Sequence, residues 1–74
     1  MDYKLNVTIN KDKDGYFVFC PELPGCHTQG DTIEEALVNI KEAAGLYLET
    51  MTKDEINEAL NKEILTTSIH LNVA

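Results

Sequence analysis

Apolar and polar side chains alternate along the first segment of the chain. Between Tyr3 and Asn10 the odd positions hold Tyr, Leu, Val and Ile, and the even positions hold Lys, Asn and Thr. A period of two over eight residues predicts a strand with one buried face. The dipeptide Asp14-Gly15 then offers the positive-φ residue that a hairpin turn needs, so residues 16–20 are expected to form a second strand.

The second strand is apolar on both faces, unlike the first. Its faces carry Tyr16, Val18 and Cys20 on one side and Phe17 and Phe19 on the other. A chain of 74 residues has little material to cover both faces. We therefore expect a homo-oligomer, a dimer or a tetramer, with the short helix near residues 52–63 as the alternative cover. The expected oligomer interface consists of Tyr16, Phe17, Val18 and Phe19.

Two prolines interrupt the sheet after the second strand. Pro21 and Pro24 cannot donate a backbone hydrogen bond, and Gly25 permits a tight turn. Residues 26–29 are then expected to return as a short third strand.

Spacing of three and four residues predicts a long helix after residue 32. Its apolar stripe consists of Ile33, Ala36, Leu37, Ile40, Ala43, Ala44, Tyr47, Leu48 and Met51. Thr32 and Glu35 have the spacing of a capping box at its start, and Thr52 and Glu55 repeat that spacing before a second, shorter helix. Period-two alternation from Leu65 onward predicts a last strand. The expected fold is therefore an α+β domain with an antiparallel sheet in the order β-β-β-α-α-β.

Thirteen acidic and six basic side chains give the chain a formal net charge of −7. This charge repels phosphate backbones and anionic lipids and attracts a basic protein. We expect no direct DNA binding and no membrane binding. The N-terminal residues resemble neither a signal peptide nor a membrane anchor, so a cytoplasmic location is expected.

Few residues could carry chemistry. Cys20, Cys26, His27 and the distant His70 could in principle bind zinc, but no C-x-x-C pair is present. Cys26 and His27 are adjacent and would point to opposite faces of a strand, which disfavours a catalytic pair. We therefore expect neither a metal, a cofactor nor catalytic residues, and we expect a protein that is not an enzyme.

Four linked motifs carry a family resemblance. They are the strand motif D-G-Y at 14–16, the turn P-x-L-P-G-C at 21–26, the step Q-G-D-T at 29–32 and the helix motif E-E-A-L at 34–37. In this order they closely resemble the HicB-like antitoxin family, and with the first strand they span about two thirds of the chain.

The resemblance implies a fold and a function for the whole chain, residues 1–74. The fold would be a truncated RNase H-like arrangement, with one long helix packed on the sheet and without nuclease carboxylates. The function would be to bind a small basic HicA-type toxin, an mRNA-cleaving protein, and to cover its active surface. The C-terminal part has the length of a short helix and a strand, so no C-terminal DNA-binding module is expected. The alternative is an orphan homo-oligomer with a non-toxin partner or ligand.

The turn between the second and third strands is the expected place of toxin contact. Its prolines make it stiff, so little entropy is lost on docking. Glu22 is expected to face solvent there, with Pro24 and His27 beside it, and Asp12 and Asp14 are expected to add attraction at longer range.

Overall fold

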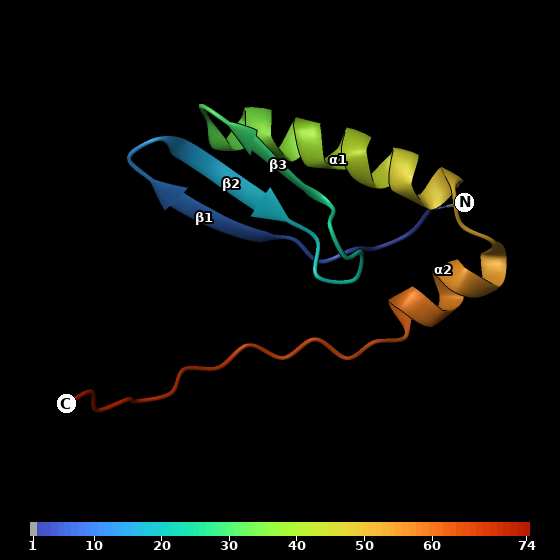
Figure 1. The fold of residues 1–74 in the computed structure, drawn as a ribbon. Helices are drawn as coiled ribbons and strands as arrows, with labels where there is room; N and C mark the ends of the chain where they lie inside the picture. The colour runs from blue at the N-terminus through green and yellow to red at the C-terminus, as the bar shows by residue number, and fades with distance from the viewer. Residues whose placement is uncertain (1) are drawn as a thin grey trace.

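Three antiparallel strands and two helices make up the fold, in the order β1 (Thr8–Asp12), β2 (Gly15–Phe19), β3 (His27–Gly30), α1 (Ile33–Glu49) and α2 (Lys53–Leu60) (Figure 1). The computed structural model describes residues 2–74. The sheet order is β1-β2-β3, with Ile9, Val18 and Thr28 in register across it. The expected α+β class with an antiparallel sheet is confirmed, whereas the RNase H-like relationship stays a prediction.

β1 begins later than the alternation from Tyr3 predicts. Its first residue, Thr8, pairs with Phe19, the last residue of β2. Beyond Phe19 the chain turns at Pro21, so β2 does not extend far enough to pair with residues 4–7. The backbone N–H of Asn6 instead donates to the carboxylate of Glu22, at 3.1 Å from Oε2. A side chain thus satisfies a backbone group that the missing strand would have satisfied.

α1 packs mainly on β3 and β2, as expected of the helix on the sheet. It is not the long helix that was expected, because it ends at Glu49 after 17 residues, or about 25 Å. Thr32 is its N-cap, and the Thr32 hydroxyl accepts a hydrogen bond from the backbone N–H of Glu35 at 3.1 Å. The helix and the sheet enclose one core, formed by Val18, Cys20, Leu23, Cys26, Ala36, Ile40, Ala44 and Ala59.

Gly30 lets α1 approach the sheet closely. A Cβ atom at this position would lie 2.6 Å from the backbone nitrogen of Ala36 and 3.0 Å from its Cα atom. Both atoms belong to the helix backbone and cannot rotate away. The Q-G-D-T motif therefore contains a glycine because the helix backbone touches the last residue of β3.

α2 turns back beneath the end of α1. It begins with a full capping box, in which Thr52 and Glu55 exchange hydrogen bonds of 3.2 and 2.8 Å. Ile56 and Ala59 are its buried residues. The second helix that the sequence predicts is therefore present.

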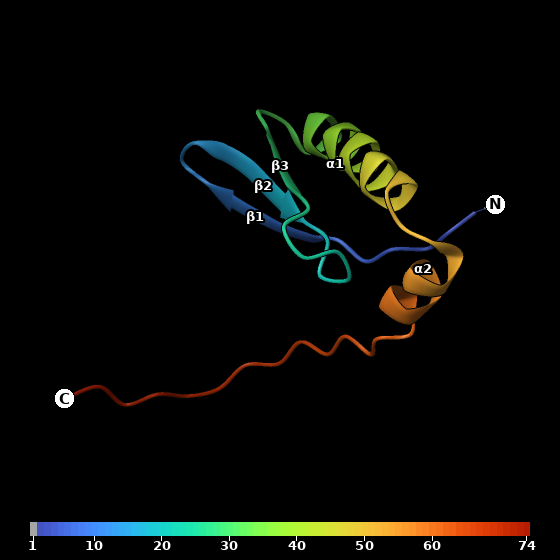
Figure 2. The ribbon, with the colours of Figure 1, turned by 45° about the vertical axis from the view of Figure 1, so that its right-hand side comes forward.

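The last strand that the alternation from Leu65 predicts is absent. Residues 61–74 contain no strand or helix, and all of them are exposed. Both views show this tail running along the β1 side of the sheet, separate from it (Figures 1 and 2). Alternation fixes which side chains share a face, but a strand also needs a neighbouring backbone, and the tail has none in its own chain. The observed order is therefore β-β-β-α-α.

The close approach at Gly30 predicts opposite effects for two glycine-to-alanine changes. Gly30→Ala should lower the free energy of unfolding by about 1–3 kcal/mol, because its methyl group overlaps the backbone of α1. Gly45 lies inside α1 with nothing within 4 Å of an added Cβ, so Gly45→Ala should raise it by about 0.5–1 kcal/mol. Urea unfolding followed by circular dichroism measures both. Equal effects of the two changes would contradict the close packing at Gly30.

Candidate partner-binding surface

A compact turn joins β2 to β3. The backbone N–H of Leu23 donates to Cys20, that of Cys26 donates to Leu23, and that of Cys20 donates to Cys26, at 3.0–3.1 Å. Gly25 has a φ of 82°, a conformation that favours glycine. The exposed Pro24 accepts a hydrogen bond on its carbonyl from the hydroxyl of Tyr47 at 2.9 Å. The turn is thus held both internally and from α1.

Glu22 does not face solvent, contrary to the sequence expectation. Its exposed fraction is 4%, and Leu23 beside it is fully buried. The Glu22 carboxylate accepts hydrogen bonds from the backbone N–H and the side-chain amide of Asn6, the latter at 2.9 Å, and from the thiol of Cys20 at 3.6 Å. The carboxylate joins the turn to the N-terminal segment, so it stabilises the fold and is not available to a partner.

Cys20 and Cys26 are free and buried in the core, and Cys20 lies beside this carboxylate. Burial raises the pKa of both thiols above the ordinary value of 9.0, and at Cys20 the nearby Glu22 carboxylate also disfavours the thiolate. Among residues 2–74 no three His, Cys, Asp or Glu side chains gather as metal ligands. Both cysteines therefore serve as small apolar core residues.

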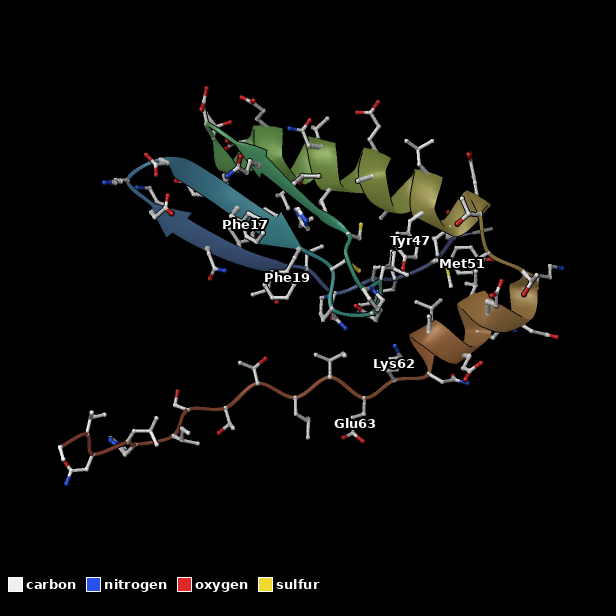
Figure 3. The ribbon with its side chains drawn as sticks, viewed as in Figure 1. Phe17, Phe19, Tyr47, Met51, Lys62 and Glu63 are labelled. Atoms are coloured by element: carbon white, nitrogen blue, oxygen red, sulfur yellow. The ribbon has the colours of Figure 1, made fainter. Side chains whose placement is uncertain are left out.

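The sheet face away from α1 carries an aromatic cluster. Phe17 and Phe19 (Figure 3) lie on this face, with ring centroids 6.4 Å apart. The ring of the exposed His27 lies 5.4 Å from that of Phe17. We call Phe17, Phe19 and His27 the open-face cluster. Both phenylalanines are only half-buried, so no element of residues 2–74 covers this face fully.

Two of the four residues expected at an oligomer interface lie on the other face. Val18 is fully buried against α1. Tyr16 is partly buried against the same core, and the Lys11 ammonium lies 5.7 Å from its ring. These two side chains are covered within their own chain, which leaves Phe17 and Phe19 as the available part of the set.

Asp12 and Asp14 lie at the opposite end of the sheet from the turn. Asp12 is the last residue of β1 and accepts the backbone N–H of Asp14 at 2.8 Å. It pairs with Gly15, whereas His27 pairs with Phe19. Four residues of extended strand separate these two levels, about 13 Å. The structure thus brings Pro24 and His27 to one end of the sheet and the two aspartates to the other.

Glu58 is an exposed carboxylate that the sequence did not single out. It lies on α2 and, with Glu55, borders a hollow of about 190 Å³ that Pro24, Tyr47 and Met51 also line. The position of α2 against the turn depends on tertiary packing, so the helical pattern of residues 53–60 alone did not reveal it. Glu58 supplies, beside Pro24, the exposed negative charge that was expected of Glu22.

The buried carboxylate makes Glu22 a test of folding. Glu22→Ala should lower the free energy of unfolding by about 1–3 kcal/mol, because it leaves the N–H groups of Asn6 without their acceptor. Glu58→Ala removes the same charge from an exposed position and should change it by less than about 0.5 kcal/mol. Denaturant titration of both variants is the measurement. If Glu22→Ala leaves the free energy of unfolding unchanged, the Glu22 carboxylate does not stabilise the fold.

Burial of the two thiols predicts a pH-dependent stability. Thiols in the unfolded chain lose their protons near pH 9, whereas the raised pKa values keep Cys20 and Cys26 protonated in the folded state. This contribution to stability is complete below pH 9 and falls as the pH rises above it. Urea unfolding at pH 8 and pH 10 measures the change, with a Cys20→Ala, Cys26→Ala double variant as the control for other titrating groups. If the wild type and the double variant lose the same free energy of unfolding between pH 8 and pH 10, the thiols are not the cause of the loss.

Comparison with known proteins places the chain in a family. Residues 3–71 match the family described as HicB_like antitoxin of bacterial toxin-antitoxin system. A UPF0150 protein of Helicobacter pylori is 44% identical over 70 residues, 95% of this chain and 97% of that protein. A UPF0150 protein of Thermoplasma acidophilum is 57% identical over 51 residues, 68% of this chain and 74% of that protein.

The similarity extends beyond these two relatives. A UPF0150 protein of Archaeoglobus fulgidus is 41% identical over 63 residues, 84% of this chain and 91% of that protein. No solved structure gives a significant match. Neither helix in residues 2–74 has the length and apolar character needed to cross a bilayer. The match over residues 3–71 confirms the resemblance that the four motifs carry, and the chain belongs to the HicB-like antitoxin family.

Proposed function

We propose that the chain is an antitoxin that binds a small basic HicA-type toxin and covers the surface with which that toxin cleaves mRNA. The observation that carries the proposal is the family match over residues 3–71, in a chain with a net charge of −7. An acidic protein is drawn to the cationic surface that an RNA-cleaving protein needs. The antitoxin acts by occupying that surface and needs no catalytic residue of its own.

The proposed contact surface lies at the turn end of the sheet. The open-face cluster supplies aromatic area of the kind that dominates protein interfaces, in Phe17, Phe19 and His27. Pro24 lies on the turn that joins the ends of β2 and β3, and this turn is anchored to Tyr47, so docking orders little additional chain. Glu58 adds an exposed carboxylate beside Pro24.

Asp12 and Asp14 have a different part in this proposal. They lie about 13 Å from the His27 level of the sheet, beyond the roughly 8 Å over which exposed charges act strongly at physiological salt. They contribute to the negative field that guides a basic partner and make no direct contact at the turn.

The proposal predicts that a charge change at Glu58 weakens toxin binding more than the same change elsewhere. Glu58→Lys should raise the Kd for a basic HicA-type toxin from the same genome at least tenfold, and more at low salt than at high salt. Glu42→Lys is the matched control, because Glu42 is exposed on α1 and its substitution changes the net charge by the same amount. Calorimetric titration at two salt concentrations measures both.

Inhibition of mRNA cleavage tests the antitoxin function separately from the position of the contact site. The wild-type chain should stop mRNA cleavage by the toxin at a stoichiometric ratio. If wild type neither binds nor inhibits the toxin, the antitoxin function itself is wrong. If wild type inhibits and the two lysine variants bind equally well, the function stands and Glu58 is outside the contact surface.

A further inference from the structure

The C-terminal tail has the composition of a strand but no partner. Residues 64–73 contain no Asp, Glu, Lys or Arg, no Pro and no Gly, in a chain whose charged fraction is 26%. The apolar side chains at alternate positions are the most exposed of the molecule, with exposed fractions of 82% for Leu65, 74% for Ile69, 79% for Leu71 and 85% for Val73. A segment of this kind left in water promotes aggregation.

The chain exposes more surface than a compact protein of its size. Its accessible surface is 6134 Å², whereas about 4,600 Å² is typical for a folded protein of 8.3 kDa. Its radius of gyration is 14.5 Å, against about 11 Å for a compact domain of 74 residues. The excess of roughly 1,500 Å² exceeds the roughly 800 Å² that each partner buries in a stable interface. The extended chain therefore exposes enough additional surface to form a stable dimer interface.

One edge of the sheet is protected and the other is open. At the β3 edge the side-chain amide of Asn39, from α1, donates to the carbonyl of Gln29 at 2.9 Å. At the opposite edge every residue of β1 is exposed. The Asn6 N–H points toward Glu22 on the β2 side, so the N–H groups of Val7 and Ile9, at alternate positions, point to the open edge. An added strand therefore finds its hydrogen-bonding groups at β1.

An apolar groove lies beside the same edge. α1 packs on β3 and β2, and leaves a groove of about 700 Å³ between itself and the N-terminal segment. Apolar residues of both elements line the groove, among them Leu5, Val7, Leu37, Ala44 and Leu48. A strand placed beside β1 would direct alternate side chains into this groove, which matches the alternation of the tail.

We infer that residues 64–73 of one chain pair with the open β1 edge of a second chain and place Leu65, Ile69 and Leu71 over its groove. No residue from 62 to 74 takes part in a hydrogen bond within its own chain. Each chain therefore carries both a segment with the alternation of a strand and an open strand edge. When two chains are related by a two-fold axis, the tail of each can pair with the β1 edge of the other at the same time, so the assembly is a closed dimer. This exchange leaves the open-face cluster available to another partner.

Light scattering at micromolar concentration tests the exchange on the full chain. The wild-type protein should have the mass of two chains. The double variant Ile69→Asp, Leu71→Asp places two charges on the groove side of the tail and should weaken dimerisation at least a hundredfold, giving the mass of one chain. The double variant Ser68→Asp, Asn72→Asp adds the same charge on the opposite side and should remain a dimer.

Folding is followed in the same samples by circular dichroism. Residues 65–73 form no hydrogen bond within their own chain, and Ile69 and Leu71 are 74% and 79% exposed. The Ile69→Asp, Leu71→Asp variant should therefore keep the helical signal as a monomer. A monomeric wild type overturns the inference. If the wild type is monomeric and the Ile69→Asp, Leu71→Asp variant melts at a lower temperature, the tail pairs with the β1 edge of its own chain. A dimer that survives this variant but is lost on Phe19→Asp overturns it as well, in favour of the open-face cluster.

Nuclear Overhauser contacts in a mixture of differently isotope-labelled chains locate the pairing. Contacts between residues 64–73 of one chain and residues 5–11 of the other are expected. If the tail contacts these residues only within one chain, or contacts β3 of the partner, the proposed exchange is wrong.

Discussion

The packing of α1 across the end of β3 is the contact on which the rest of the structure depends. Gly30 brings the helix backbone against the strand, and Val18 and Ala36 fill the space beneath it with no exposed surface at all. This one contact closes one face of a three-stranded sheet. It also leaves the other face and the β1 edge without full cover, so the contacts that keep a chain of 74 residues folded also determine which of its surfaces stay exposed.

The same constraint assigns different roles to the acidic residues. Glu22 lies where β2 ends, and its carboxylate takes the place of a strand for the N–H of Asn6. Glu58 lies on a helix that packs against the turn and remains exposed. Net charge alone makes these two residues equivalent, but burial makes Glu22 structural and leaves Glu58 exposed to solvent.

Local signals predicted most of the fold. The hairpin at Gly15, the cap at Thr32 and the capping box at Thr52 depend on residues a few positions apart, and each has the predicted structure. The family assignment likewise depended on contiguous motifs. The start of β1, the burial of Glu22 and the position of Glu58 depend on contacts between distant segments, which alternation and helical spacing do not encode. The prediction of a C-terminal strand was wrong for a related reason, because alternation describes which side chains share a face and no strand of the same chain lies beside residues 65–73.

The central claim is that α1 covers one face of the sheet within the chain, and that the open β1 edge pairs with residues 64–73 of a second chain. Hydrogen–deuterium exchange of the wild-type chain across a dilution series tests it most directly. At micromolar concentration every second amide of residues 64–73 and the outward amides of Val7 and Ile9 should exchange slowly, and both groups should become fast together on dilution, while those of α1 stay protected. Fast exchange of both groups at every concentration, or protection that does not change on dilution, would contradict this account.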